Sequence, residues 1–345
     1  MRQERRVAAS RPAQITTMAG YARPPALTSS GTSIAFTPCL DGDSGYRHGW
    51  SVSLLLAQIT DVHLGPLIRP RLRDLAGKRL TGYLNWARGR SDTHDMEVLA
   101  RLVADLHAQK PDHIACTGDL VNIALPGEFL LARKFMEDLG SPEGVSFVPG
   151  NHDAYVRSAI PLVARTFAPW TTDDATGRPG FPYIRRRNGV GLIGVSSAVP
   201  TAPLLASGRI GSAQRAKLAA ALDQVKAEGL PRVVMIHHPP HRTGASRARG
   251  LTDARECEAL LRKHGADLVI HGHNHRFSVS HIANGAKVPI VGAASASAAG
   301  GTLTHRAAYN LYEISGDEGR ASIKGRRRGL LDDRKTIGDL GPITL

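Results

Sequence analysis

Cysteines, aromatic residues and long apolar runs are all scarce in this sequence. Only three cysteines occur among 345 residues, and none stands in a CxxC spacing. An odd and sparse set of this kind argues against a disulfide framework and fits a reducing cytoplasm. No stretch approaches the roughly 18 consecutive apolar residues of a membrane-spanning helix, and no apolar segment follows the N-terminal arginines as a secretory signal requires. We therefore expect a cytoplasmic protein without a transmembrane helix.

Several catalytic and binding signatures are missing as well. The chain has neither a G-x-S-x-G nucleophile elbow nor a P-loop, and it has no separate nucleic-acid module. What it has in excess is positive charge, with 44 Lys and Arg against 30 Asp and Glu, a formal net charge of +14. This excess favours acidic partners such as nucleic acid, anionic lipid headgroups or phosphorylated small molecules. Arginines that merely decorate a soluble surface are an equal alternative.

The first 50 residues differ in composition from the rest of the chain. They are rich in Pro, Ser, Thr, Gly and Arg and show no sustained periodicity. Because such a composition cannot bury a core, we expect residues 1–50 to be disordered. Alternatively they are not translated, since the periodic pattern begins abruptly near Val52. We expect one catalytic domain over residues 51–325 and a C-terminal tail over residues 326–345.

Short apolar runs that end in Gly, His, Asp or Asn recur from residue 54 onward. Runs of this length are typical of strands buried on both faces of a sheet. Helical periodicity separates them at residues 95–109, 212–228 and 252–265, and short strands follow after about residue 277. The pattern predicts an α/β protein with mixed sheets. The runs are LLLAQIT (54–60), HIACTGD (113–119), VSFVPGNHD (145–153), RVVMIHH (232–238) and DLVIHGHNH (267–275).

Polar clusters at the ends of these runs supply the candidate chemistry. Functional groups of open α/β sheets gather beyond the carboxyl ends of the strands. Imidazole nitrogens with carboxylate and amide oxygens are the ligands of paired divalent metals. One histidine after an apolar strand is usually structural, but five clusters in this order are hard to explain that way. The clusters are Asp61-Val62-His63, Gly118-Asp119, Gly150-Asn151-His152-Asp153, His237-His238-Pro239 and Gly272-His273-Asn274-His275.

In residues and order, these clusters resemble the signature of the calcineurin-like metallophosphoesterases, which reads DxH, GD, GNHD, HxP and GHxH. The resemblance covers roughly residues 54–295, and every motif is intact. It implies a sandwich of two mixed β-sheets flanked by helices, with two divalent metal ions (Mn, Fe or Zn) at the strand ends. The chain is most similar to the branch of the family that includes cyclic-nucleotide phosphodiesterases.

The resemblance also implies a role for each residue. Three would hold the first metal: Asp61, His63 and His275. Three would hold the second metal: Asn151, His237 and His273. Asp119 would bridge both ions. His152 would act on the phosphate oxygens or the leaving group without binding metal, and Asp153 would orient a histidine. Two ions about 3.5–4 Å apart can clamp a phosphate and supply hydroxide at neutral pH.

Residues 66–90 form a basic, amphipathic insert between the first two motifs. Seven basic residues accompany a single acid, Asp74, and leucines, Tyr83 and Trp86 are interleaved among them. Such an insert can lie on an anionic membrane, cap the active site, or simply pack on the domain with its arginines in water. A second loop, residues 241–250, carries arginines that can hold a second phosphate or a nucleotide.

Three classes of function compete. The favoured one is a metal-dependent phosphodiesterase that hydrolyses a small-molecule phosphoester with a metal-activated hydroxide. The second is a hydrolase of a lipid-linked pyrophosphate of the UDP-sugar type, acting at the inner membrane face, which the basic insert supports. The third is a non-catalytic scaffold. A scaffold predicts missing ligands, and here none is missing.

Overall fold

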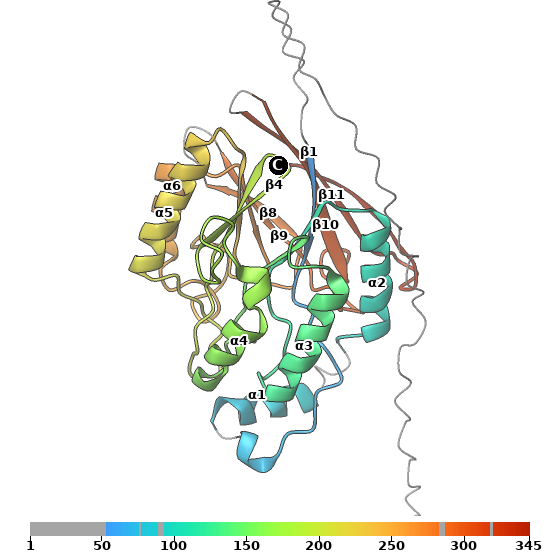
Figure 1. The fold of residues 1–345 in the computed structure, drawn as a ribbon. Coiled ribbons are helices and arrows are strands. Elements are labelled where there is room, and N and C mark those ends of the chain that lie inside the picture. Colours follow the sequence, from blue (N-terminus) through green and yellow to red (C-terminus); the bar gives the residue numbers. More distant parts are fainter. Residues whose placement is uncertain (1–52, 76, 89–92, 283–286, 318–319) are drawn as a thin grey trace, which may run out of the picture. The chain divides into compact units, whose positions relative to one another are not determined.

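Two six-stranded β-sheets lie at the centre of the structure, a computed structural model that describes residues 53–75, 77–88, 93–282, 287–317 and 320–345 (Figure 1). The described residues belong to one compact unit. The predictions for residues 1–50 lie outside the described residues. The strands are β1 (Ser53–Ile59), β2 (His113–Cys116), β3 (Val145–Phe147), β4 (Tyr183–Arg187), β5 (Val190–Gly194), β6 (Arg232–Met235), β7 (Leu268–His271), β8 (Ser278–Ile282), β9 (Val288–Gly292), β10 (Ala308–Asp317), β11 (Arg320–Leu330) and β12 (Ile337–Ile343).

Helices cover the outer faces of both sheets. The α-helices are α1 (Lys78–Ala87), α2 (Met96–Ala108), α3 (Pro126–Leu139), α4 (Ile160–Thr166), α5 (Ser212–Ala227) and α6 (Ala254–His264). Short 3₁₀ helices are η1 (Leu72–Leu75), η3 (Arg157–Ala159) and η4 (Ala168–Thr171). Helices α5 and α6 lie on one side of the sandwich, and α2 and α3 lie on the other (Figure 1). Among the described residues, no helix has the length and apolar character needed to span a bilayer.

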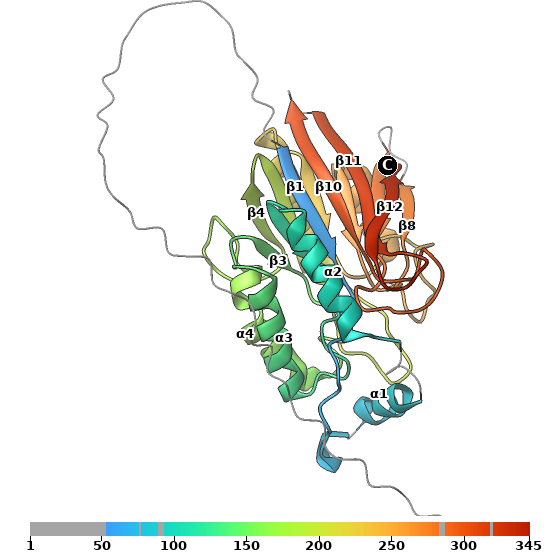
Figure 2. The ribbon, with the colours of Figure 1, turned by 90° about the vertical axis from the view of Figure 1, so that its right-hand side faces the viewer.

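Both sheets are mixed, as the sequence predicts. The first has the order β12-β11-β10-β1-β2-β3, with β1, β2 and β3 parallel and the remaining pairs antiparallel. The second has the order β4-β5-β6-β7-β9-β8, in which the pairs from β5 to β9 are parallel. Figure 2 shows β1, β10 and β11 side by side, with α2 across them. The parallel strands point their carboxyl ends in one direction and so bring the loops of the motifs together.

The side chains of β1 show why the core has layers. Leu54 and Leu56 face the second sheet and pack in a cluster that includes Val233. Ala57 and Ile59 belong instead to the cluster beneath α2 and α3. Since successive strand side chains point to opposite faces, one strand contributes to both layers. The predicted sandwich of two mixed sheets flanked by helices is confirmed.

The predicted C-terminal tail at residues 326–345 is wrong. β11 continues to Leu330, and β12 pairs with it in antiparallel register from Leu330↔Ile337 to Gly325↔Ile343. Ile343 is buried in the core between the sheets. The segment looks like a tail because β12 is an edge strand whose sequence, IGDLGPI, holds two glycines and a proline, so its apolar periodicity is weak.

Candidate metal centre

All seven predicted metal ligands meet at the carboxyl ends of β1, β2, β3, β6 and β7. Asp119 belongs to two groups of residues that could each hold a metal ion. Within each group, the ligand atoms all lie within 4.8 Å of one another. The amide of the seventh residue joins the second group, because Asn151 Oδ1 lies 2.8 Å from His273 Nδ1. The first group is Asp61, His63, Asp119 and His275, and the second is Asp119, His237 and His273.

The carboxylate of Asp119 stands between the two groups. Its Oδ2 lies 3.2 Å from His237 Nε2 and 3.9 Å from His63 Nε2, and its Oδ1 accepts the backbone N–H of His152 at 2.8 Å. Burial raises the pKa of Asp119, but the surrounding imidazoles, led by His237, outweigh burial and hold that pKa well below its usual range. An ionised, shared carboxylate is what a bridge between two cations requires.

The backbone turns sharply where the strands end. Non-glycine residues seldom adopt a positive φ, and in such positions they carry strain. Here the turns aim the side chains into one spot. Gly150 lies at the same place, where an added Cβ would stand 2.7 Å from Cε1 of His237, so no larger residue fits without displacing a ligand. Five of the seven predicted ligands have positive φ: Asp61 (50°), His63 (44°), Asp119 (58°), His273 (71°) and His275 (51°).

Backbone carbonyls orient two of the imidazoles. His237 Nδ1 lies 2.7 Å from the carbonyl of Thr117, and His63 Nδ1 lies 3.3 Å from that of Val121. Since a carbonyl only accepts, each Nδ1 carries a hydrogen. In the neutral ring, each Nε2 then presents a lone pair to the centre, which is the arrangement of metal-binding histidines. Within the described residues, the buried Nε2 atoms of His237 and His273 make no hydrogen bond. Because unsatisfied buried nitrogens are costly, the donor set fits bound cations.

His152 sits beside the ligand groups without belonging to either. Its Nδ1–H donates to the carbonyl of Asn122, which leaves Nε2 as the nitrogen that can meet a substrate. The ring makes an edge contact with His63, with 4.8 Å between centroids, and stacks on Tyr155 at 5.4 Å. This geometry suits a group that acts on phosphate oxygens or on a leaving group.

Asp153 does not do what the sequence predicts. Instead of orienting a histidine, its buried carboxylate accepts backbone N–H groups from both motif loops. Oδ2 accepts from Asp119 and Gly150, each at 2.8 Å, and Oδ1 accepts from Leu120 at 3.0 Å and Val121 at 3.3 Å. With all four contacts directed at the backbone, the carboxylate holds the Asp119 loop against the loop of Gly150. Asp153 is therefore a positioning residue for the centre.

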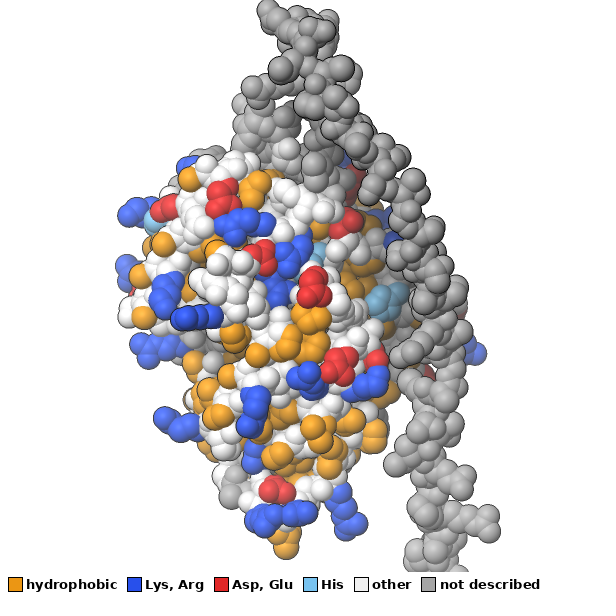
Figure 3. Space-filling view, viewed as in Figure 1, with side chains coloured by type: hydrophobic (Ala, Val, Ile, Leu, Met, Phe, Trp, Pro, Cys, Tyr) orange, Lys and Arg blue, Asp and Glu red, His pale blue; other side chains and the backbone are white. Residues whose placement is uncertain are grey.

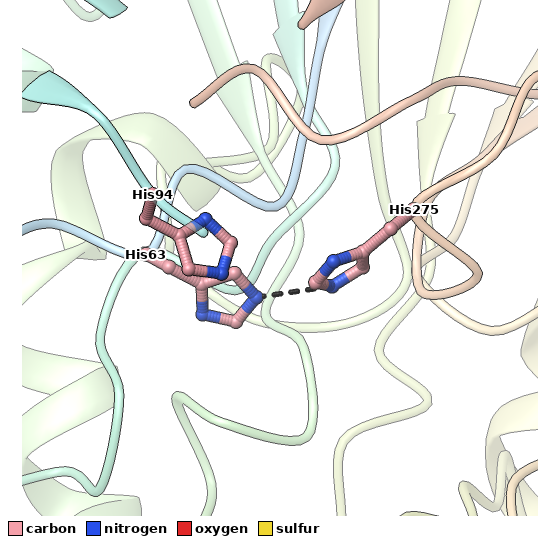
Figure 4. Close-up of side chains that lie close together, drawn as sticks. All are labelled: His63, His94 and His275. Atoms are coloured by element: carbon pink, nitrogen blue, oxygen red, sulfur yellow. Dashed lines mark hydrogen bonds between the residues drawn. The ribbon is translucent and has the colours of Figure 1, made fainter. Parts of the chain in front are cut away.

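His94 is a candidate residue that the sequence analysis missed. Figure 4 shows its ring turned toward His63 and His275, and the three form a further group able to hold a metal ion. His63 Nε2 and His275 Nε2 are 3.1 Å apart. The Ser297 hydroxyl donates to the carbonyl of Val62, so it must accept from His94 Nδ1, at 2.7 Å. The Nε2 of His94 therefore carries the lone pair. No apolar run precedes His94, so the strand-end signal could not reveal it.

The basic insert packs beside the centre. Arg79 of α1 donates to the carbonyls of Ile123 at 3.1 Å and Ala124 at 2.5 Å, in the loop that follows β2. Residues of α1 also line a pocket together with Asn151 and His152. In the 241–250 loop, Arg249 donates to the carbonyl of His273 at 3.0 Å, and Arg242 pairs with Glu258.

Fold and site together define a hydrolase of phosphoester bonds with a ligand set for two metal ions. Residues 54–277 match the calcineurin-like phosphoesterase family, and the chain belongs to that family. The resemblance drawn from the strand-end motifs is thereby confirmed, as is the class of enzyme.

Two known proteins illustrate how far the likeness extends. A Synechococcus protein named "probable cyclic nucleotide phosphodiesterase" is 27% identical over 234 residues, which cover 66% of this chain and 76% of the relative. The crystal structure of a dimetal phosphatase from Danio rerio superposes with a TM-score of 0.50 at 13% identity, covering 79% of this chain and 98% of the other. The second likeness concerns the fold alone.

Proposed function

We propose that this protein is a metal-dependent phosphodiesterase acting on a small-molecule phosphodiester. The observation that carries the proposal is the shared Asp119 carboxylate, which joins two ligand groups into one centre. Two divalent ions bound there would neutralise charge on the phosphoryl oxygens and provide hydroxide near neutral pH. The mixture of imidazole, carboxylate and amide donors suits Mn, Fe or Zn.

The protein's own groups divide the remaining work. Asp119 sets the spacing of the two ligand groups, and Asp153 holds the loop that carries it. His152 Nε2 faces substrate, because Nδ1 is held by the carbonyl of Asn122. A protonated His152 would donate to a phosphoryl oxygen or to the departing alkoxide. No nucleophilic serine or cysteine is needed.

The preference for diesters is supported by the Synechococcus relative, whose name is that of a cyclic-nucleotide phosphodiesterase. Cyclic nucleotides are therefore the first natural diesters to test.

Metal dependence and diester preference can be tested together with bis-p-nitrophenyl phosphate, p-nitrophenyl phosphate and a panel of cyclic nucleotides. We expect chelation to abolish diester hydrolysis and Mn²⁺ to restore it in the wild type but not in Asp119→Ala. Full activity in a preparation shown to be metal-free by elemental analysis would refute the proposal. Hydrolysis of the monoester alone would refute the diester preference.

A second candidate, hydrolysis of a lipid-linked pyrophosphate at the inner membrane face, is favoured by the surface of the insert. Leu72 of the insert is 91% exposed, and Arg69, Arg71 and Arg73 flank it in the sequence. Leu204, which lines a pocket together with α1 of the insert, is 89% exposed. Figure 3 shows hydrophobic and basic side chains side by side at the lower end of the view, where Figure 1 shows α1. Each basic residue near an anionic surface contributes about 1 kcal/mol, which salt screens.

The test of membrane binding is co-sedimentation with anionic liposomes. We expect binding at low salt and much less at high salt. Reversing Arg69, Arg71 and Arg73 to Glu should abolish it, with turnover of bis-p-nitrophenyl phosphate nearly unchanged. Arg79 is left out of this set, because it bonds backbone carbonyls. If the wild type ignores anionic liposomes at low salt, the membrane candidate fails.

A further inference from the structure

A pocket of about 460 Å³ opens beside the candidate metal centre. Residues of α1 form one part of its wall, and the segment Leu204–Ala206 forms another. Asn151 and His152 line it from the side of the centre, and Tyr155 lies next to them. A phosphoryl group held at the centre would therefore leave this space for the rest of the substrate.

Lys78, at the start of α1, is the buried cation of this pocket. The residue is only 8% exposed to solvent. The ammonium donates to Thr201 Oγ1 at 2.5 Å and to the carbonyl of Leu205 at 2.9 Å, and it lies 4.5 Å from the centre of the Tyr155 ring. These three partners are neutral, so they satisfy hydrogen bonds without balancing the charge.

A buried ammonium with neutral partners is costly, because it loses hydration without gaining a counter-ion. Burial lowers the pKa of Lys78 to about 8, and the charge of Asp119 opposes that change. Asp119 is also the predicted bridging ligand, so cations at the centre would offset its charge. The positive charge of Lys78 is then left for an anion in the pocket.

The helix that carries Lys78 is held tightly against the domain. At Gly82 an added Cβ would stand 2.8 Å from Cγ2 of Ile123 and 3.0 Å from Cζ of Tyr155. A glycine inside a helix is destabilising relative to alanine, and here the close approach to Ile123 and Tyr155 explains it. Arg79 fastens the same turn to the carbonyls of Ile123 and Ala124. The part of the pocket wall that α1 forms is therefore closely packed against the rest of the domain, and it lines the same pocket as His152.

We propose that this pocket is a subsite for the part of the substrate beyond the scissile phosphate, and that Lys78 selects substrates carrying a second anionic group there. The inference rests on the proposed function and narrows its substrate class to nucleotide-sized phosphodiesters with an additional phosphate or carboxylate. Lys78 acts here on binding and selectivity, while bond cleavage remains with the centre.

The selectivity can be measured with matched chromogenic diesters. Thymidine 5′-(p-nitrophenyl phosphate) and its 3′-phosphorylated form share the scissile bond and the leaving group, and they differ in one anionic group. We expect wild-type kcat/KM to be higher for the 3′-phosphorylated substrate, mainly through KM. Lys78→Met should reduce this preference at least tenfold. Thr201→Val is the control, because it removes a neutral contact and keeps the charge, and it should preserve the preference.

A binding measurement separates this inference from the proposed function. Calorimetric titration with thymidine 3′,5′-bisphosphate and thymidine 5′-phosphate needs no turnover, and the bisphosphate should lose at least tenfold more affinity than the monophosphate in Lys78→Met. Equal losses for both ligands, equal effects of Lys78→Met and Thr201→Val, or a wild type that ignores the second phosphate would each overturn the inference. Intact binding selectivity in a protein that cleaves no diester would overturn only the proposed function.

Discussion

Replacing Asp153 with asparagine should loosen the loop that carries Asp119 from the loop that begins at Gly150. The carboxylate accepts four backbone N–H groups, two on each oxygen. Burial, and then the charge of Asp119, raise the pKa of Asp153 to about 7, while the backbone donors lower it. Above that pH the side chain is ionised and can accept all four bonds. An amide has one accepting oxygen, so two backbone donors would face an NH₂ group instead.

The size of the effect follows from those two lost bonds. A hydrogen bond to a charged group contributes about 1.5–3 kcal/mol, and a buried donor left unpaired costs a similar amount. We therefore expect Asp153→Asn to lower the free energy of unfolding by about 3–6 kcal/mol. Because Asp119 belongs to both ligand groups, the displaced loop should also weaken metal binding at both.

Glu128→Gln is the matched control. The Glu128 carboxylate is also buried and accepts backbone N–H groups, from Asn122 at 2.6 Å, Ile123 at 3.2 Å and Leu125 at 2.8 Å. It belongs to neither ligand group. Urea unfolding above the pKa of Asp153 should show a stability loss in both variants, whereas calorimetric titration with Mn²⁺ should show a large loss of affinity only in Asp153→Asn. Wild-type stability in Asp153→Asn, or equal losses of Mn²⁺ affinity in the two variants, would refute the reasoning.

Four further predictions concern the centre, its pocket and the N-terminal residues. Asp119→Ala should retain less metal by elemental analysis than Asn151→Ala, because only a bridging ligand serves both ions; equal metal contents would argue against a bridge. His152→Ala should keep its metal and lose roughly 10²–10⁴-fold in kcat, the usual range for an acid–base group; metal loss would make it a ligand. Burial lowers the pKa of Lys78 to about 8, so the affinity for thymidine 3′,5′-bisphosphate should decline as the pH rises through that pKa and the ammonium loses its proton. In the variant Lys78→Arg the guanidinium stays protonated, so the decline in affinity should disappear. An unchanged pH profile in this variant would assign the titration to another group. A chain that starts at Val52 should fold and keep its activity, and a marked fall in Tm would show that the preceding residues pack on the domain.

The strand-end motifs could be predicted because the chemistry and the local structure coincide in the sequence. Each ligand cluster directly follows an apolar run, and parallel strands bring such ends to one edge of a sheet. Asp61 after β1 and Asp119 after β2 are examples, as is His273 after β7. The C-terminal strand β12 gives no comparable signal. The sequence predicts a tail there, because the two glycines and the proline of IGDLGPI (337–343) interrupt the alternation that marks a strand.

Sequence by itself determined the family, the two mixed sheets and the set of residues that meet at the centre. Only the tertiary structure decided what the neighbours of that centre do. The contacts of Lys78 with Thr201, 123 residues away, and of His94 with Ser297, 203 residues away, join segments that carry no mutual signal in the chain. The same holds for Asp153, whose oxygens meet backbone groups rather than a histidine. Such roles depend on which buried donors and charges lie next to a side chain once the chain has packed. The residues near it in the sequence do not show which these will be.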